Sequence, residues 1–92
     1  MSEFRREITI VNQRGLHARA SAKFVNAVSQ LPEGCLVRIA KDGNEAAGGS
    51  ILGLMMLGAA KGDTVELIVA GESDEAAFGE LSALIEDGFG EE

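Results

Sequence analysis

Residues 7–25, EITIVNQRGLHARASAKFV, change from one hydrophobic period to another, and this change decides the fold. In the first part Ile8 and Ile10 alternate with polar residues, as in a half-buried β-strand. Beyond Gly15 the apolar residues recur every three or four positions, which predicts a helix beginning at Ala18. Because glycine permits a sharp backbone turn, the stretch is predicted to form a strand, a tight turn and a helix.

The predicted helix ends at Pro32 and Gly34, which stop helical periodicity. Its buried face is expected to consist of alanine and valine residues, with larger apolar side chains at the margin. The face residues are Ala18, Ala22, Val25 and Val28, and the margin residues are Phe24 and Leu31.

Strand-like alternation returns in CLVRIA, residues 35–40, and is followed by the hairpin signal Asp42-Gly43. A short partner strand is expected over residues 45–47, antiparallel to the first. TVELIVA, residues 64–70, has apolar residues on both faces, which indicates a central strand.

Two further helices are predicted. Ser50 can cap a short helix whose apolar residues exceed what one face can bury, so some of them are expected to be exposed. Ser73 can cap a last helix, whose apolar side chains are Phe78, Leu81, Leu84 and Ile85. The tail, residues 89–92, is expected to fray.

The resulting order, β-α-β-β-α-β-α, predicts an α+β fold in a single domain over residues 1–92. One four-stranded antiparallel sheet with three helices on one face, an open-faced β-sandwich, is the simplest way to bury these elements.

Composition excludes several function classes. The 92 residues carry a formal net charge of −7, which argues against nonspecific binding to nucleic acid. No stretch approaches the roughly 20 apolar residues of a membrane helix, and the N-terminus lacks a secretion signal, so a cytoplasmic location is expected. Cys35 is the only cysteine, so neither an internal disulfide nor a zinc spacing can be assigned, and we expect it to be a small buried hydrophobe. No metal or cofactor site is predicted.

His17, the only histidine, falls at or beside the first residue of the first helix. Unpaired amide groups and the positive end of the helix dipole favour a neutral, nucleophilic imidazole there. The same amides could receive an anion attached to the ring, and Arg19 could add charge-assisted hydrogen bonds. These residues therefore predict a phosphoryl-acceptor site, although a histidine here is also compatible with an ordinary helix cap.

Two segments, GLHARASAKFV and GGSILGLMMLGAAKGDTVEL, resemble the active-site signature and the regulatory-serine region of the HPr family, histidine-containing phosphocarriers of the bacterial phosphoenolpyruvate-dependent phosphotransferase system. Their separation is also similar, and the resemblance covers nearly the whole chain. It implies that His17 accepts a phosphoryl group on Nδ1 from phosphorylated enzyme I. The group would then pass to the A component of an enzyme II or to a regulatory counterpart.

The resemblance also implies roles for other residues. Arg19 matches the arginine that assists the phosphohistidine. Ser50 matches the serine that an HPr kinase/phosphorylase modifies in some bacteria. The residues that match an exposed apolar docking patch are Ile51, Leu52 and Met55, whereas Met56 is equally compatible with docking and with the core.

One departure from the family pattern is Ala20, where proline commonly follows the arginine. Alanine loosens the first helical turn but restores an amide donor that could face the phosphate, so the chemistry is expected to survive. The form LHARASA is more similar to the nitrogen-related branch, whose members often regulate rather than feed sugar uptake.

Two functions of different classes remain open. The chain can be a phosphocarrier, or a regulatory interaction protein whose phosphorylation at His17 or Ser50 controls partner binding without onward transfer. A ligand-binding module is poorly supported, since the sequence has neither tryptophan nor tyrosine and lacks a P-loop. A monomer is expected, because a carrier docks different partners over one face.

Overall fold

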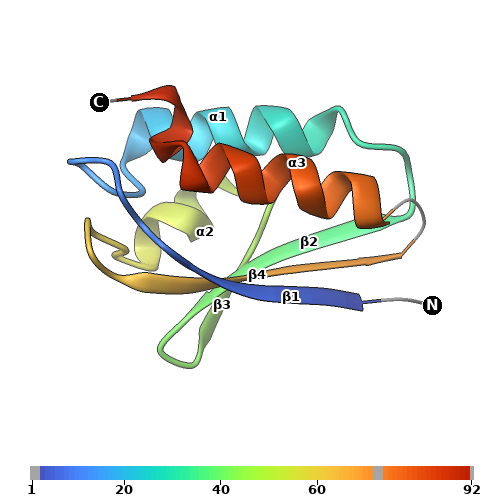
Figure 1. The fold of residues 1–92 in the computed structure, drawn as a ribbon, viewed down its shortest axis with the longest axis horizontal. Coiled ribbons are helices and arrows are strands. Elements are labelled where there is room, and N and C mark those ends of the chain that lie inside the picture. Colours follow the sequence, from blue (N-terminus) through green and yellow to red (C-terminus); the bar gives the residue numbers. More distant parts are fainter. Residues whose placement is uncertain (1–2, 72–73, 92) are drawn as a thin grey trace.

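Four antiparallel strands form one sheet, and three helices cover one of its faces (Figure 1). This computed structural model describes residues 3–71 and 74–91. The elements in chain order are β1 (Glu3–Thr9), α1 (Ala18–Ser29), β2 (Cys35–Lys41), β3 (Asn44–Ala47), α2 (Ile51–Met56), β4 (Thr64–Gly71), α3 (Asp74–Glu86) and the single 3-10 turn η1 (Gly88–Gly90). The predicted open-faced β-sandwich is confirmed, with η1 as an additional element.

The strand order is β1-β4-β2-β3, so β4 lies in the interior of the sheet. Leu67 at its centre pairs with Arg6 of β1 on one side and with Ile39 of β2 on the other. Its helix-facing side chains, Val65, Leu67 and Val69, are at most 1% exposed. The predicted central position of this strand is confirmed.

The hairpin between β2 and β3 turns at Asp42 and Gly43. Both residues have positive φ, 52° and 85°, as a two-residue turn that matches the twist of a hairpin requires. The predicted hairpin is confirmed, and β3 begins one residue before the expected range.

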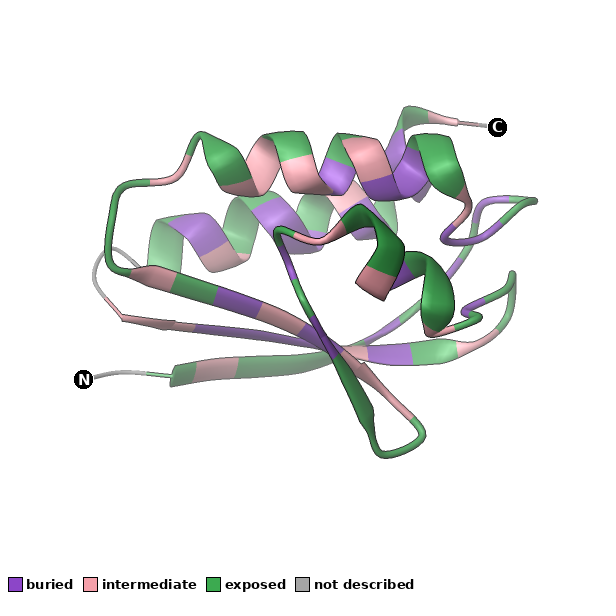
Figure 2. Ribbon diagram, turned by 180° about the vertical axis from the view of Figure 1, so that it is seen from behind, coloured by how far each residue is buried: buried purple, intermediate pink, exposed green. Residues whose placement is uncertain are grey.

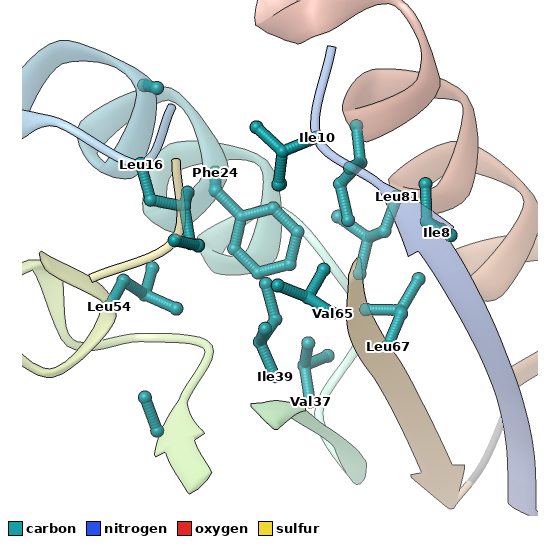
Figure 3. Packing of buried hydrophobic residues seen from close by; sticks show 14 of the residues in the cluster. Ile8, Ile10, Leu16, Phe24, Val37, Ile39, Leu54, Val65, Leu67 and Leu81 are labelled. Atoms are coloured by element: carbon teal, nitrogen blue, oxygen red, sulfur yellow. The ribbon is translucent and has the colours of Figure 1, made fainter. Parts of the chain in front are cut away.

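The hydrophobic core lies between the sheet and the helices. Figure 3 shows Phe24 of α1 pointing toward Ile39 and Val65 of the sheet, and all three are fully buried or nearly so. Burial of a side chain of this size contributes about 1.5–3 kcal/mol. Phe24 therefore makes a main connection between α1 and the sheet.

The buried face of α1 differs from the predicted one. Phe24 lies at the centre of the buried face rather than at its margin, and Ala18 is exposed. Leu16, just before the helix, is also buried. Since one phenylalanine buries far more apolar area than two alanines, the helix is rotated to place Phe24 inward. The predicted start of the helix at Ala18 is confirmed, but the helix ends at Ser29, before Pro32 is reached, and its orientation was predicted incorrectly.

Helix α3 packs through Leu81 and Ile85, which are buried as expected. Phe78 stacks against Phe4 of β1 with ring centroids 5.4 Å apart. The predicted cap residue, Ser73, lies outside the described residues.

The expectation of a frayed tail is wrong for residues 89–91. Phe89 is 1% exposed and belongs to the core, and Glu91 folds back toward the start of α1. Gly88, Phe89 and Gly90 all have positive φ, which turns the chain back onto the protein. The apolar area of Phe89 outweighs the flexibility of its two glycine neighbours.

The other face of the sheet carries charged side chains. Ile68 points to this face but is only 1% exposed, because it lies opposite Arg5 on β1 and Arg38 on β2, whose long aliphatic stems can cover it. The guanidinium groups pair with Glu66 and Glu45 at 3.1 and 2.9 Å. Across residues 3–71 and 74–91, no helix has the length and apolar character needed to cross a membrane.

Candidate functional site

The turn before α1 is fixed by a close backbone approach. Gly15 has φ of 62°, and a Cβ atom there would lie 2.2 Å from the carbonyl oxygen of Ala59. The next amide, of Leu16, donates to that same carbonyl at 3.0 Å. Asn12 adds a hydrogen bond from Nδ2 to the Gly15 carbonyl at 2.8 Å. The start of α1 is therefore held against the loop before β4.

His17 is the N-cap residue of α1, as predicted. Its Nδ1 accepts a hydrogen bond from the Arg19 amide at 3.3 Å, and its own carbonyl accepts from the Ser21 amide at 2.9 Å. The imidazole side chain is 15% exposed. Nδ1 therefore faces the unpaired amides of the first helical turn, where the helix dipole favours negative charge.

Glu91, in the tail, contacts the opposite side of the imidazole. Both carboxylate oxygens lie 3.0 Å from Nε2 of His17. Nδ2 of Asn12 donates to Oε1 at 3.1 Å, and Nε of Arg19 lies 3.7 Å from Oε2. The hydrogen bond with His17, a second from Asn12 and the positive charge of Arg19 hold the pKa of Glu91 below its usual value, against the opposing effect of desolvation. The carboxylate form is therefore favoured in this position.

The tail that carries Glu91 is anchored at two points. Phe89 is buried in the core, and its carbonyl accepts a hydrogen bond from Nζ of Lys23 on α1 at 2.9 Å. Sequence reasoning missed Glu91 because the contact joins residues 74 positions apart. An aromatic residue between two glycines, as in Gly-Phe-Gly, was the available signal for a turn with an apolar anchor.

A hollow of about 350 Å³ lies beside this cluster, lined by Gln13, Arg14, Arg19, Gly90 and Glu91. Two of the lining residues are arginines, and the Arg19 side chain is 68% exposed, so it can turn toward an anion in the hollow. A larger hollow, about 440 Å³, lies over the charged face of the sheet and includes none of the predicted site residues.

Much of helix α2 is coloured as exposed in Figure 2, and the exposed residues include large apolar ones. Ser50 caps the helix by accepting a hydrogen bond from the Gly53 amide at 2.9 Å, which confirms the predicted cap. Leu54 alone among the α2 residues is fully buried. The exposed large residues are Ile51 at 41%, Leu52 at 69%, Met55 at 40% and Met56 at 77%. The core interpretation of Met56 is therefore wrong, because its position on the short helix points away from Leu54.

Cys35 differs from its expected place. It is half-buried at the start of β2 and packs against the edge of the core, rather than being enclosed in it. Among the residues that the structure describes, no cluster of histidine, cysteine, aspartate and glutamate side chains has the composition of a metal site.

The comparison with protein families decides the assignment. The family model described as "PTS HPr component phosphorylation site" matches residues 4–87. The chain belongs to the HPr family.

Similarity to HPr proteins extends over almost the full chain. The present chain is 43% identical to the phosphocarrier protein HPr of Pseudomonas aeruginosa, over 92% of this chain and 93% of that protein. It is 34% identical to the phosphocarrier protein NPr of Shewanella violacea, over 99% and 98% of the two chains. The crystal structure of an HPr from Thermoanaerobacter tengcongensis is similar with a TM-score of 0.86 at 39% identity, covering 100% of this chain and 99% of that one.

Proposed function

We propose that this HPr-family chain is a phosphocarrier of the phosphotransferase system, in which His17 accepts a phosphoryl group from phospho-enzyme I. The group then passes to the A component of an enzyme II or to a regulatory counterpart. In this role the chain is modified and discharged in each cycle and has no substrate of its own. The single observation that carries the proposal is the position of His17 Nδ1 at the N-terminus of α1.

The helix start supports the chemistry in two ways. Nδ1 is held as a hydrogen-bond acceptor by the Arg19 amide, so its lone pair is available once that weak 3.3 Å bond is released. The released amide can then donate to an oxygen of the phosphoryl group that becomes attached to Nδ1. Attack and stabilisation of the product therefore use the same helix terminus.

Arg19 is proposed to bind the phosphoryl group through its guanidinium. It borders the hollow beside His17, and its side chain is mostly exposed and only loosely paired with Glu91 at 3.7 Å. A phosphoryl dianion offers it a stronger partner than one shared carboxylate. Ala20 lies next in the first turn and is fully buried, which supports a close-packed helix start without proline.

Helix α2 is proposed as the partner-docking surface, through Ile51, Leu52, Met55 and Met56. Apolar side chains exposed together on a short helix are typical of interaction sites. The helix packs against α1, the helix that carries His17. A single face could thus bring a partner to both the apolar patch and the imidazole.

Ser50 is proposed as a regulatory phosphorylation site for an HPr kinase/phosphorylase. Its hydroxyl oxygen already accepts from the Gly53 amide, so a phosphate at this position would retain a local partner. The added charge would stand next to Ile51 and Leu52 and weaken apolar docking. This feature also favours the second candidate function, a regulatory protein whose phosphorylation state controls partner binding.

The relatives bear on the branch to which the chain belongs. The HPr of Pseudomonas aeruginosa, at 43% identity, is more similar to it than the NPr of Shewanella violacea, at 34%. We therefore favour the HPr branch over the nitrogen-related branch. Incubating the phosphorylated protein with an enzyme II A component and, separately, with a nitrogen-branch counterpart tests the choice by which of the two becomes phosphorylated.

The carrier step is tested by mixing the purified protein with enzyme I, Mg²⁺ and phosphoenolpyruvate and following its intact mass. One acid-labile phosphate is expected, and it should be absent from His17→Ala. Absence of phosphate on the wild-type protein, with an enzyme I that phosphorylates another HPr, would overturn the proposal and leave regulation through Ser50 as the better function.

A further inference from the structure

The tail residue Glu91 contacts His17 in a way that selects one form of the imidazole. A carboxylate can only accept hydrogen bonds, so Nε2, 3.0 Å from both of its oxygens, is the nitrogen that bears the proton. The Arg19 amide can only donate, so Nδ1 is the nitrogen that bears the lone pair. Two independent neighbours on opposite sides of the ring therefore require the same tautomer.

Glu91 is held in place by more than its contact with the ring. The Glu91 side chain is 16% exposed and also accepts from Nδ2 of Asn12, a residue that is 1% exposed. Phe89, two positions earlier, is fixed in the core. The carboxylate is thus positioned before any phosphoryl donor arrives.

We infer that Glu91 is a positioning residue for phosphoryl transfer, which keeps the proton on Nε2 of His17 both before and after Nδ1 is phosphorylated. The inference rests on the proposed function, and it assigns a role to a residue outside residues 4–87, the part that matches the family model.

The proton balance explains why this matters. On loading, the Nδ1 lone pair forms the N–P bond while the bond from phosphorus to the donor breaks and its electron pair stays with the donor. The ring, which keeps its Nε2 proton, becomes a cation that pairs with the Glu91 carboxylate. On discharge the acceptor forms a bond to phosphorus while the N–P bond breaks and its electrons return to Nδ1. The leaving group at phosphorus is therefore a neutral imidazole.

Without the carboxylate, the phosphorylated ring can lose its Nε2 proton to water. Discharge from that form would expel an imidazolate anion, which is a much poorer leaving group than neutral imidazole. Glu91 therefore keeps the phosphohistidine in the form that transfers readily, and no proton has to enter or leave the site in either direction.

The test compares Glu91→Gln with the wild-type protein and with Glu86→Gln. The glutamine amide can offer either its oxygen or its NH₂ group to Nε2, so it removes the selection while keeping the size of the side chain. Glu86 is an exposed residue of α3 paired with Arg6 at 2.9 Å, so its variant makes the same change in charge elsewhere. Glu91→Asp keeps the carboxylate on a shorter side chain.

The first readout is the imidazole ¹⁵N spectrum of the unphosphorylated proteins at a pH where the ring is neutral. We expect the Nε2–H tautomer in the wild type and in Glu86→Gln. In Glu91→Gln its preference over the Nδ1–H tautomer should fall about 10-fold, the value of one charge-assisted hydrogen bond, with partial recovery in Glu91→Asp. An Nδ1–H tautomer in the wild type, or the same tautomer ratio in Glu91→Gln, would overturn the inference.

The second readout is the pH profile of phosphoryl discharge to an enzyme II A component. For Glu91→Gln the decline of the rate at high pH should begin at lower pH than for the wild type and for Glu86→Gln, whereas identical profiles would contradict the inference. Failure of enzyme I to load the wild type would instead refute the carrier proposal, and the ¹⁵N spectra of the unphosphorylated protein would still decide the tautomer.

Discussion

At the scale of single residues, the site depends on a backbone contact that only glycine allows. Gly15 combines a positive φ with a near contact to the Ala59 carbonyl, whereas Gly43 in the hairpin has a positive φ and open space around it. Substituting each glycine in turn separates the energetic cost of a side chain at positive φ from the cost of a steric clash with the Ala59 carbonyl. Because His17 lies two residues after Gly15, a clash introduced at Gly15 would also displace the site.

Gly15→Ala is expected to lower the free energy of unfolding by about 2–4 kcal/mol, against about 1 kcal/mol for Gly43→Ala. The larger loss arises because the new methyl group must displace the Ala59 carbonyl. Urea unfolding of both variants measures the difference. Equal losses would show that the loop carrying Ala59 moves away at little cost.

At the scale of elements, the short segments α2 and η1 both contribute to the candidate site. Helix α2 exposes apolar residues around a single buried leucine, and η1 holds the tail against α1. Both depend on one residue each: the cap Ser50 in the first case and the anchor Phe89 in the second. Each can be tested by one substitution with a matched control.

Ser50→Asp is expected to keep the fold and to weaken docking. Aspartate is as good an N-cap as serine, so the thermal midpoint should stay within about 2 °C of the wild type, whereas Ser50→Ala should lose about 1 kcal/mol of unfolding free energy. The added charge beside Ile51 should raise the KM of enzyme I for this protein. Ser29→Asp, at the far end of α1, is the control, and an equal rise in KM there would exclude a local effect.

Phe89→Ala is expected to cost about 3 kcal/mol of unfolding free energy, because it removes a fully buried aromatic ring. It should also release Glu91 and so produce the same change in the imidazole ¹⁵N spectrum as Glu91→Gln. Phe78→Ala, which removes a half-buried ring from α3, should cost less and leave that spectrum unchanged. A frayed tail in the wild type would instead make Phe89→Ala nearly neutral.

At the scale of the whole molecule, the lowered pKa of Glu91 links folding to pH. A carboxylate whose pKa is lower in the folded than in the unfolded state stabilises the fold fully above its unfolded value of about 4.5, and the contribution is lost as pH falls through the folded value. The difference in unfolding free energy between the wild type and Glu91→Gln should thus be present at pH 7 and disappear in strong acid. A difference that stays constant over this range would contradict the link.

Much of the fold could be predicted because local periodicity marks each element. Ile8, Val37 and Leu81 all lie inward where alternation or helical spacing placed them. What the pattern could not supply was long-range information. The rotation of α1 depends on how Phe24 fills space above the sheet, and the tail depends on a core site for Phe89 that exists only after folding.

In the candidate site, too, the residues with local sequence signals were predicted and those brought in by long-range contacts were not. His17 and the cap Ser50 were found at the correct helix starts, because caps leave local sequence signals. Asn12 and Glu91 were missed, because they meet His17 through the turn before α1 and through the tail, and no local pattern connects those two segments.

The strand order has a consequence for how the protein is made. β1 pairs with no described strand other than β4, and β4 also separates β1 from β2, so β1 has no strand neighbour until residues 64–71 have left the ribosome. Glu91 emerges later still, after η1. The sheet can therefore close only after residues 64–71 have been synthesised, and a stalled nascent chain ending near residue 63 would expose β1 and β2 as unpaired edges, open to chaperones and proteases.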